Sequence, residues 1–298
     1  MNEGSNVIID GKNTFQRSCE HWSEAGRLEM EGFYALASID YEHLAKSIDW
    51  KVWLETIQKS VGNHRLQLLD VACGSGKFPS ALLSHGGVKS ATINPIDYAL
   101  LDPSSFSISE TRKVLATPFQ AGVEYEMKLQ DLECKPGFFD VVWATHALYA
   151  IPQNELEEAL RCMMNAIGNI EDLRAIGSGF IAHAKSNSHY LEFFKQFVQG
   201  FKQGVGEPFT SSEQIISVLT QMELPLQVKE ISYTNGAPEA MEKEVEQYLQ
   251  RCVFDESVSL RQMLDNPITG PYLESCRNNG MWQFSQNVQM IFINAPIN

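Results

Sequence analysis

The chain lacks the cysteine patterns that would link it to a metal or to an oxidising compartment. Its six cysteines include no C-x-x-C pair, and no group of histidines and cysteines has the spacing of zinc ligands. We therefore predict free thiols, a cytoplasmic location and no metal site. The N-terminus has neither a basic start nor an apolar core, so it does not resemble a signal peptide. No stretch approaches the roughly 18 apolar residues of a membrane span, so we expect no membrane partner.

Positive charge is also scarce. The 23 lysines and arginines face 37 aspartates and glutamates, which gives a formal net charge of −14. Such a field repels a phosphate backbone, which argues against nucleic acid as the main partner, and it mildly favours a cationic small molecule. With 298 residues, 44% hydrophobic and 20% charged, the chain is predicted to be globular, with one elaborated domain or two small ones. Nothing in the sequence indicates an oligomeric state.

Apolar runs alternate with helical patterns along most of the chain. This alternation predicts a doubly wound, Rossmann-like α/β fold with a mostly parallel, seven-stranded sheet. An N-terminal helical cap (residues 1–62) is expected to act as a lid on the sheet domain (residues 63–298), which carries a helical insertion at about residues 237–282. The last two strands are expected to form an antiparallel hairpin at one edge. The strand candidates are residues 66–71, 98–102, 123–129, 138–144, 179–183, 226–233 and 288–294.

A glycine turn follows the first strand candidate. The strand ends in Asp70, and the turn contains Gly74 and Gly76 before a helix begins. Glycine lets the backbone turn sharply and lets a ligand approach closely. However, an acid at this place repels a pyrophosphate, and the third glycine of a dinucleotide fingerprint is missing. The turn therefore favours a ligand with a cationic part and argues against a nicotinamide dehydrogenase.

Two further acids follow the next strand candidates. Asp102 ends the second candidate and can accept hydrogen bonds from both hydroxyls of a ribose. Asp131 ends the third candidate, where a plain turn residue is the alternative. Acids at three successive strand ends suit a nucleoside without phosphates.

The turn resembles a known motif. Asp70-Val71-Ala72-Cys73-Gly74-Ser75-Gly76 is similar to motif I of the class I S-adenosylmethionine-dependent methyltransferases, D/E-x-G-x-G-x-G, with alanine in place of the first glycine. In that family the turn passes under the methionine part of the cofactor, and the acid after the second strand holds the ribose. Residues after the third strand flank the adenine. The resemblance implies S-adenosylmethionine as cofactor, bound by Asp70, Ala72, Gly74, Gly76, Asp102, Pro103, Gln130, Asp131 and Thr145.

The chain also resembles the histamine N-methyltransferase-like branch along most of its length. Asp102-Pro103-Ser104 and Phe139-Asp140 followed by Leu148-Tyr149 are among the points of contact. Such enzymes build an amine pocket from an N-terminal lid, the segment after strand four and a loop before the last strand. The resemblance implies substrate contacts at the matching positions, which are Glu42, His146, Tyr149 and Gln286. His146 stands where that branch has a glutamine, so the identity of the substrate does not follow.

Methyl transfer requires a lone pair on the acceptor, so an amine must first lose a proton. We predict His146 as a catalytic residue, because a neutral imidazole can accept that proton. Tyr149 is the second catalytic candidate, and both Tyr149 and Trp143 offer aromatic faces to a cation, although Trp143 also fits the core. Glu42 or Asp40 can pair with a distal ammonium.

Together these features predict methyl transfer from S-adenosylmethionine to a nitrogen of a small-molecule amine. An O- or carboxyl-methyltransferase of natural-product biosynthesis is the first alternative. A carboxylate substrate would require an arginine or lysine in the substrate pocket, and the predicted pocket contains few of these residues. A nucleoside-binding module without catalysis is the second alternative.

Overall fold

The computed structural model describes residues 13–62, 64–89, 91–169 and 177–294. Its strands are β1 (Gln67–Val71), β2 (Ile96–Leu101), β3 (Phe119–Tyr125), β4 (Val141–Thr145), β5 (Ser178–Ala184), β6 (Leu226–Pro238), β7 (Arg277–Asn278) and β8 (Met281–Ile293). They form one sheet in the order β3-β2-β1-β4-β5-β8-β6, with β7 paired to β8. The first five strands run parallel to their neighbours, whereas β8 is antiparallel to β5 and to β6. The predicted α/β fold is confirmed, with one short strand beyond the seven expected.

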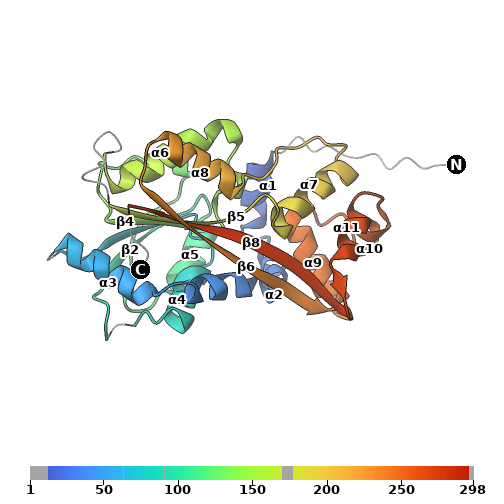
Figure 1. The fold of residues 1–298 in the computed structure, drawn as a ribbon, viewed down its shortest axis with the longest axis horizontal. Helices are drawn as coiled ribbons and strands as arrows, with labels where there is room; N and C mark the ends of the chain where they lie inside the picture. The colour runs from blue at the N-terminus through green and yellow to red at the C-terminus, as the bar shows by residue number, and fades with distance from the viewer. Residues whose placement is uncertain (1–12, 63, 90, 170–176, 295–298) are drawn as a thin grey trace.

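Helices cover both faces of the sheet (Figure 1). One face carries α2 (Arg27–Lys46), α3 (Trp50–Val61) and α4 (Lys77–His85), and the other carries α6 (Leu156–Ile167) and α8 (Ser212–Gln221). The remaining α-helices are α1 (Thr14–His21), α5 (Ser105–Val114), α7 (His189–Phe201), α9 (Glu242–Val253), α10 (Leu260–Asp265) and α11 (Thr269–Ser275). Short 3-10 helices are η1 (Leu129–Asp131), η2 (Leu148–Ala150) and η3 (Gln153–Glu155). Among the residues described, no helix has both the length and the apolarity to span a membrane.

Alternation along the strands divides the core into two layers. Successive side chains of a strand point to opposite faces, so Leu68 packs in the cluster with α3 and α4, and Leu69 packs in the cluster with α6 and α8. In β4, Trp143 belongs to the first cluster and Val142 to the second.

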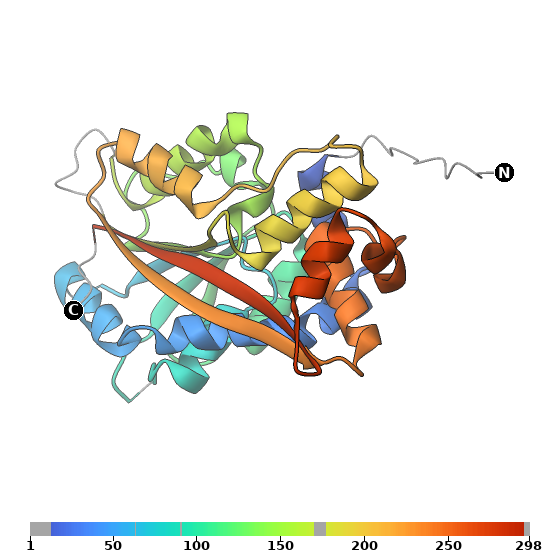
Figure 2. The ribbon, with the colours of Figure 1, turned by 45° about the vertical axis from the view of Figure 1, so that its right-hand side comes forward.

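The hairpin of β6 and β8 is longer than the sequence predicts. The two strands pair from Leu226 opposite Ile293 to Pro238 opposite Met281. Their far half extends past the parallel strands and packs with α7, α9 and α11 (Figure 2). Polar residues such as Asn235 and Gln286 are fully buried there, and they interrupt the apolar pattern by which strands are recognised. The helices α9 to α11 lie within the predicted insertion.

The prediction for the third strand is wrong by several residues. It placed the strand at residues 123–129, whereas β3 ends at Tyr125. β3 is an edge strand whose central residues are exposed, so its position is set by backbone pairing with β2, beginning at Ile96 opposite Phe119, and not by an apolar face. Asp131 therefore does not end a strand. It lies in η1, and its side chain is exposed.

Candidate functional site

Two neighbouring hollows open at the carboxyl edge of β1, β2 and β4. The first hollow lies between the glycine turn, the end of β2, the segment after β4, and α1. The second hollow lies between α2, α7, α9 and the same segment after β4. Trp22, Tyr41, His146 and Tyr149 line both hollows. The two hollows therefore share four lining side chains.

The glycine turn passes through positive φ angles at Ala72 (50°), Gly74 (56°) and Gly76 (68°). Gly74 lines the first hollow, and a Cβ atom there would find its nearest neighbour, the oxygen of Ala72, 4.0 Å away. The missing side chain thus leaves room for a ligand. Gly76 is not among the lining residues. A Cβ there would lie 2.5 Å from Cγ2 of Val114 and 3.1 Å from Cα of Thr111, so Gly76 serves the close packing of α5.

The two glycines give a matched pair of substitutions. Gly76→Ala is expected to lower the free energy of unfolding by about 2–4 kcal/mol, because it adds a clash with α5 to the strain of a positive φ. Gly74→Ala adds the strain of a positive φ without the clash, and it should lower the free energy of unfolding by about 1–2 kcal/mol. Urea unfolding followed by circular dichroism measures both values. Equal losses would contradict the packing role of Gly76.

Asp102 links the glycine turn to the segment after β2, and both line the first hollow. Its Oδ2 accepts a hydrogen bond from the N–H of Gly74 (3.1 Å), and its Oδ1 accepts one from the N–H of Ser104 (2.9 Å). Burial raises the pKa of Asp102 to about 6, although these backbone N–H groups oppose the rise. A carboxylate offers about four acceptor positions, so Asp102 keeps capacity for further donors such as hydroxyls.

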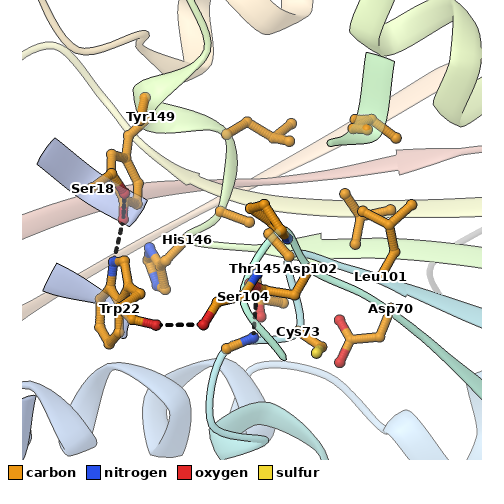
Figure 3. A pocket seen from close by; sticks show the side chains of 18 of the residues that line it. Ser18, Trp22, Asp70, Cys73, Leu101, Asp102, Ser104, Thr145, His146 and Tyr149 are labelled. Atoms are coloured by element: carbon orange, nitrogen blue, oxygen red, sulfur yellow. Dashed lines mark hydrogen bonds between the residues drawn. The ribbon is translucent and has the colours of Figure 1, made fainter. Parts of the chain in front are cut away.

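Asp70 lies deeper, at the end of β1 (Figure 3). It accepts a hydrogen bond from the hydroxyl of Tyr98 (2.6 Å), and burial raises its pKa to about 7. The indole N–H of Trp143 donates to the same hydroxyl (3.2 Å). Trp143 is fully buried on the α3 and α4 face and lines neither hollow. The interpretation of Trp143 as a substrate contact is therefore wrong, because alternation in β4 turns its side chain into the core.

A lid of α1 and the residue after it closes the first hollow. The hydroxyl of Tyr149 accepts a hydrogen bond from the indole N–H of Trp22 (2.7 Å) and lies 3.1 Å from Oγ of Ser18. The carbonyl oxygen of Trp22 accepts a hydrogen bond from Oγ of Ser104 (2.7 Å). Arg251 of α9 lies over the Trp22 ring, 4.4 Å from its centre. The hydrogen bonds of Trp22 join the lid to η2 and to the segment after β2 (Figure 3), and Arg251 joins it to the insertion.

His146 stands between the two hollows, directly after β4. It has a positive φ of 51°, and its backbone N–H donates to the carbonyl of Ala182 (2.9 Å). Its Nε2 atom is buried and has no hydrogen-bond partner. Burial, and to a lesser degree the charge of His183, lowers the pKa of His146 to about 3. The imidazole is therefore neutral near pH 7 and offers an unused polar atom at the junction.

Asp40 is the carboxylate of the second hollow. Its side chain comes from α2, is 3% exposed, and accepts a hydrogen bond at Oδ2 from the hydroxyl of Tyr190 (2.6 Å). Its Oδ1 has no partner. Burial raises the pKa of Asp40 to about 7, against the lowering effects of the polar side chains of Tyr190, Asn235 and Tyr233. The walls around it are mostly aromatic, formed by Trp22, Phe33, Tyr41, Tyr149, Tyr190, Phe209 and Phe254.

The raised pKa of Asp40 predicts a pH-dependent stability. Its pKa is higher in the folded than in the unfolded chain, so its contribution is fully present below about pH 4 and is lost as the pH rises to about 7. Between pH 4.5 and pH 8, the free energy of unfolding of the natural protein should therefore fall by about 2–4 kcal/mol relative to that of Asp40→Asn. Urea unfolding of both proteins at the two pH values measures the difference. A constant difference would show that Asp40 does not titrate in this range.

The other predicted site residues fall into two groups. Ala72, Pro103, Gln130 and Thr145 line the first hollow, whereas Asp131 does not. Glu42 and Gln286 line neither hollow.

Glu42 and Gln286 lie outside both hollows for clear structural reasons. Glu42 lies on the outer side of α2, where it pairs with Lys46. Gln286 is buried in β8, where it accepts a hydrogen bond from Ser188 (2.5 Å) and donates one to Tyr248 (3.2 Å). The predicted substrate acid, Glu42, is thus two residues away from Asp40, the acid of α2 that lines the second hollow.

Comparisons with known proteins agree with this geometry. Residues 69–167 match the family described as "Methyltransferase domain". A search of curated protein sequences finds no match.

Solved structures resemble the chain in fold at low sequence identity. The magnesium protoporphyrin IX methyltransferase of Synechocystis PCC 6803 with bound S-adenosylhomocysteine has a TM-score of 0.51 and 11% identity, over 94% of this chain and 99% of that one. A putative methyltransferase of Bacillus halodurans gives 0.49 and 11%, over 80% and 97%. The phosphoethanolamine N-methyltransferase 2 of Haemonchus contortus gives 0.42 and 14%, over 81% and 52%. The expected methyltransferase fold is confirmed.

Proposed function

We propose that this chain is a class I S-adenosylmethionine-dependent methyltransferase and that it methylates a nitrogen of a small-molecule amine bound in the second hollow. The main support is the position of Asp40, a buried carboxylate with one unused oxygen, among aromatic rings next to the cofactor site. A carboxylate and aromatic faces are the groups that attract an organic cation.

The first hollow fits S-adenosylmethionine, which supplies a methyl group on a positively charged sulfur. Asp102 has acceptor capacity for the ribose hydroxyls, and Gly74 leaves open space beside it. Gln130 lines the hollow on the side of β3, where we assign the adenine, and Thr145 lines it at the end of β4. Asp70 and Asp102, at or directly after the ends of β1 and β2, suit a nearby sulfonium, whereas the lysines of this hollow, Lys77 and Lys128, come from α4 and from the segment before η1.

In this proposal the helices before β1 act as a cap. We assign residues 1–62 to the cap and residues 63–298 to the methyltransferase domain, with the insertion at about 237–282. Trp22 and Ser18 contact Tyr149, so the lid is joined to the segment after β4 that carries His146 and Tyr149. A closed lid excludes water from the transfer.

The reaction is a displacement in which the acceptor nitrogen bonds to the methyl carbon as the carbon–sulfur bond breaks. Asp40, with its unused Oδ1, holds the amine and can take a proton from an incoming ammonium, since its pKa lies near 7. His146 accepts a hydrogen bond from the nitrogen through Nε2, which turns the nitrogen lone pair toward the first hollow. Tyr149, on both walls, presents its ring to the positive charge.

A carboxylate acceptor is the second candidate, because Arg251 also lines the second hollow. Two of its guanidinium nitrogens, Nη1 and Nη2, are already bonded to His21, and the group is stacked on Trp22. We therefore infer that Arg251 holds the lid against α9, and we retain the amine as the favoured substrate.

Binding to the enzyme saturated with S-adenosylhomocysteine tests the proposal. Isothermal titration with aromatic amines and with carboxylic acids of the same carbon skeletons should show binding of the amines alone. Arg251→Gln should leave that preference unchanged. Preferred binding of the acids, lost in Arg251→Gln, would favour carboxyl methylation and contradict our proposal.

A further inference from the structure

Lys77 is a cation on the wall of the first hollow that no acid neutralises directly. It is the first residue of α4, and its Nζ lies 4.4 Å from the centre of the Tyr34 ring, which lines the same hollow. Within the described part of the chain, Lys77 forms no ion pair. Glu110 is the acid that acts on it from a distance, but Glu110 is engaged by Lys113 (2.6 Å) and Arg27 (3.5 Å).

This environment favours a bound anion. Burial lowers the pKa of Lys77, and the charge of Glu110 only partly offsets the effect. The ammonium group of Lys77 is thus partly desolvated, and no acid fully compensates its charge. An anion that entered the hollow would supply one, and the positive end of the α4 dipole would act in the same direction.

The proposed orientation of the cofactor in the first hollow places its carboxylate near Lys77. With the ribose at Asp102, we place the adenine on the side of Leu129 and Gln130, because these residues line the hollow after β3. The amino-acid part must then run the other way, along Gly74 and toward Lys77. Oγ of Ser75, between them, is buried and without a hydrogen-bond partner. The second lysine of the hollow, Lys128, lies on the adenine side, 4.7 Å from the centre of the Phe15 ring.

We propose that Lys77 binds the α-carboxylate of the methionine part of the cofactor, with the Tyr34 ring holding its side chain in place and Ser75 as a second polar contact. The proposal rests on S-adenosylmethionine as methyl donor and is independent of which atom the enzyme methylates. Lys77 is then a cofactor residue that motif I does not include, although it directly follows the last glycine.

Two ligands that differ only in the amino-acid part test the role of Lys77. S-adenosylhomocysteine carries the carboxylate, and 5′-methylthioadenosine lacks the whole amino-acid part. Lys77→Met should weaken binding of S-adenosylhomocysteine by about 10–100-fold, as expected for loss of one charged hydrogen bond. It should leave the affinity for 5′-methylthioadenosine within about twofold. Lys77→Arg should restore most of the loss.

Lys128→Met is the matched control, since it removes a lysine from the same hollow. It should affect both ligands alike, and thermal unfolding of each variant checks that it is folded. An equal loss of both ligands in Lys77→Met, no loss of either, or a selective loss in Lys128→Met instead would overturn the assignment of Lys77. If the natural protein binds neither ligand, the cofactor assignment fails and this proposal with it.

Discussion

Replacing Asp102 with alanine is expected to weaken binding of S-adenosylhomocysteine by at least about 100-fold. The substitution removes the proposed acceptor of two ribose hydroxyls, and each hydrogen bond to a charged group contributes about 1.5–3 kcal/mol. It also releases the N–H groups of Gly74 and Ser104, which Asp102 holds at 3.1 and 2.9 Å. The glycine turn thereby loses its link to the end of β2. Isothermal titration measures the change.

Asp97 provides the control for this experiment. It lies on the same strand, β2, at the opposite edge of the sheet, where it pairs with Arg65 (2.9 Å). Asp97→Ala should leave the affinity unchanged within about twofold. If Asp102→Ala binds the ligand as well as Asp97→Ala does, the first hollow does not bind the cofactor in the way we describe.

Asp40→Asn is expected to lower kcat/KM for amine methylation by about 100–1,000-fold. The substitution keeps the shape of the side chain but removes the proposed counter-charge for the amine and the proposed base for its proton. Binding of S-adenosylhomocysteine should be unchanged, because Asp40 lines only the second hollow. For the natural enzyme, kcat/KM should rise with pH through about 7, as Asp40 ionises, and this rise should be absent in Asp40→Asn.

Glu42→Gln separates this role from the general charge of α2. Glu42 lies two residues away, on the outer side of the helix, and pairs with Lys46. The variant should keep the activity and the pH profile of the natural enzyme. If Glu42→Gln loses as much activity as Asp40→Asn, or if neither loses any, Asp40 is not the amine site.

The positions of several residues that line the first hollow could be predicted because their geometry is local. Asp70, Gly74 and Asp102 lie at or directly after strands whose apolar runs are continuous, so their positions follow from the order of strands in a parallel sheet. β3 could not be placed in this way, because an exposed edge strand has no buried face to mark its register. The error for β3 moved Asp131 into the predicted site.

The second hollow depends on contacts between distant segments. Asp40 is paired with Tyr190, 150 residues away, and Trp22 with Arg251. No spacing in the sequence shows that α2, α7 and α9 meet at one place. The choice between Asp40 and Glu42 illustrates this, since both acids lie on one helix and only packing decides which one is buried. Lys77 had a local signal, as the residue directly after the glycine turn, but a lysine at the start of a helix is ordinary.

Transfer of radiolabelled methyl from S-adenosylmethionine to a panel of small molecules tests the central claim most directly. The panel should contain amines, alcohols and carboxylic acids on matched aromatic and aliphatic skeletons, with the natural protein and Asp40→Asn assayed side by side. We predict label on the nitrogen of one or more amines, with little or none in the Asp40→Asn reaction. Label found on oxygen alone, or on amines equally with both proteins, would contradict the account.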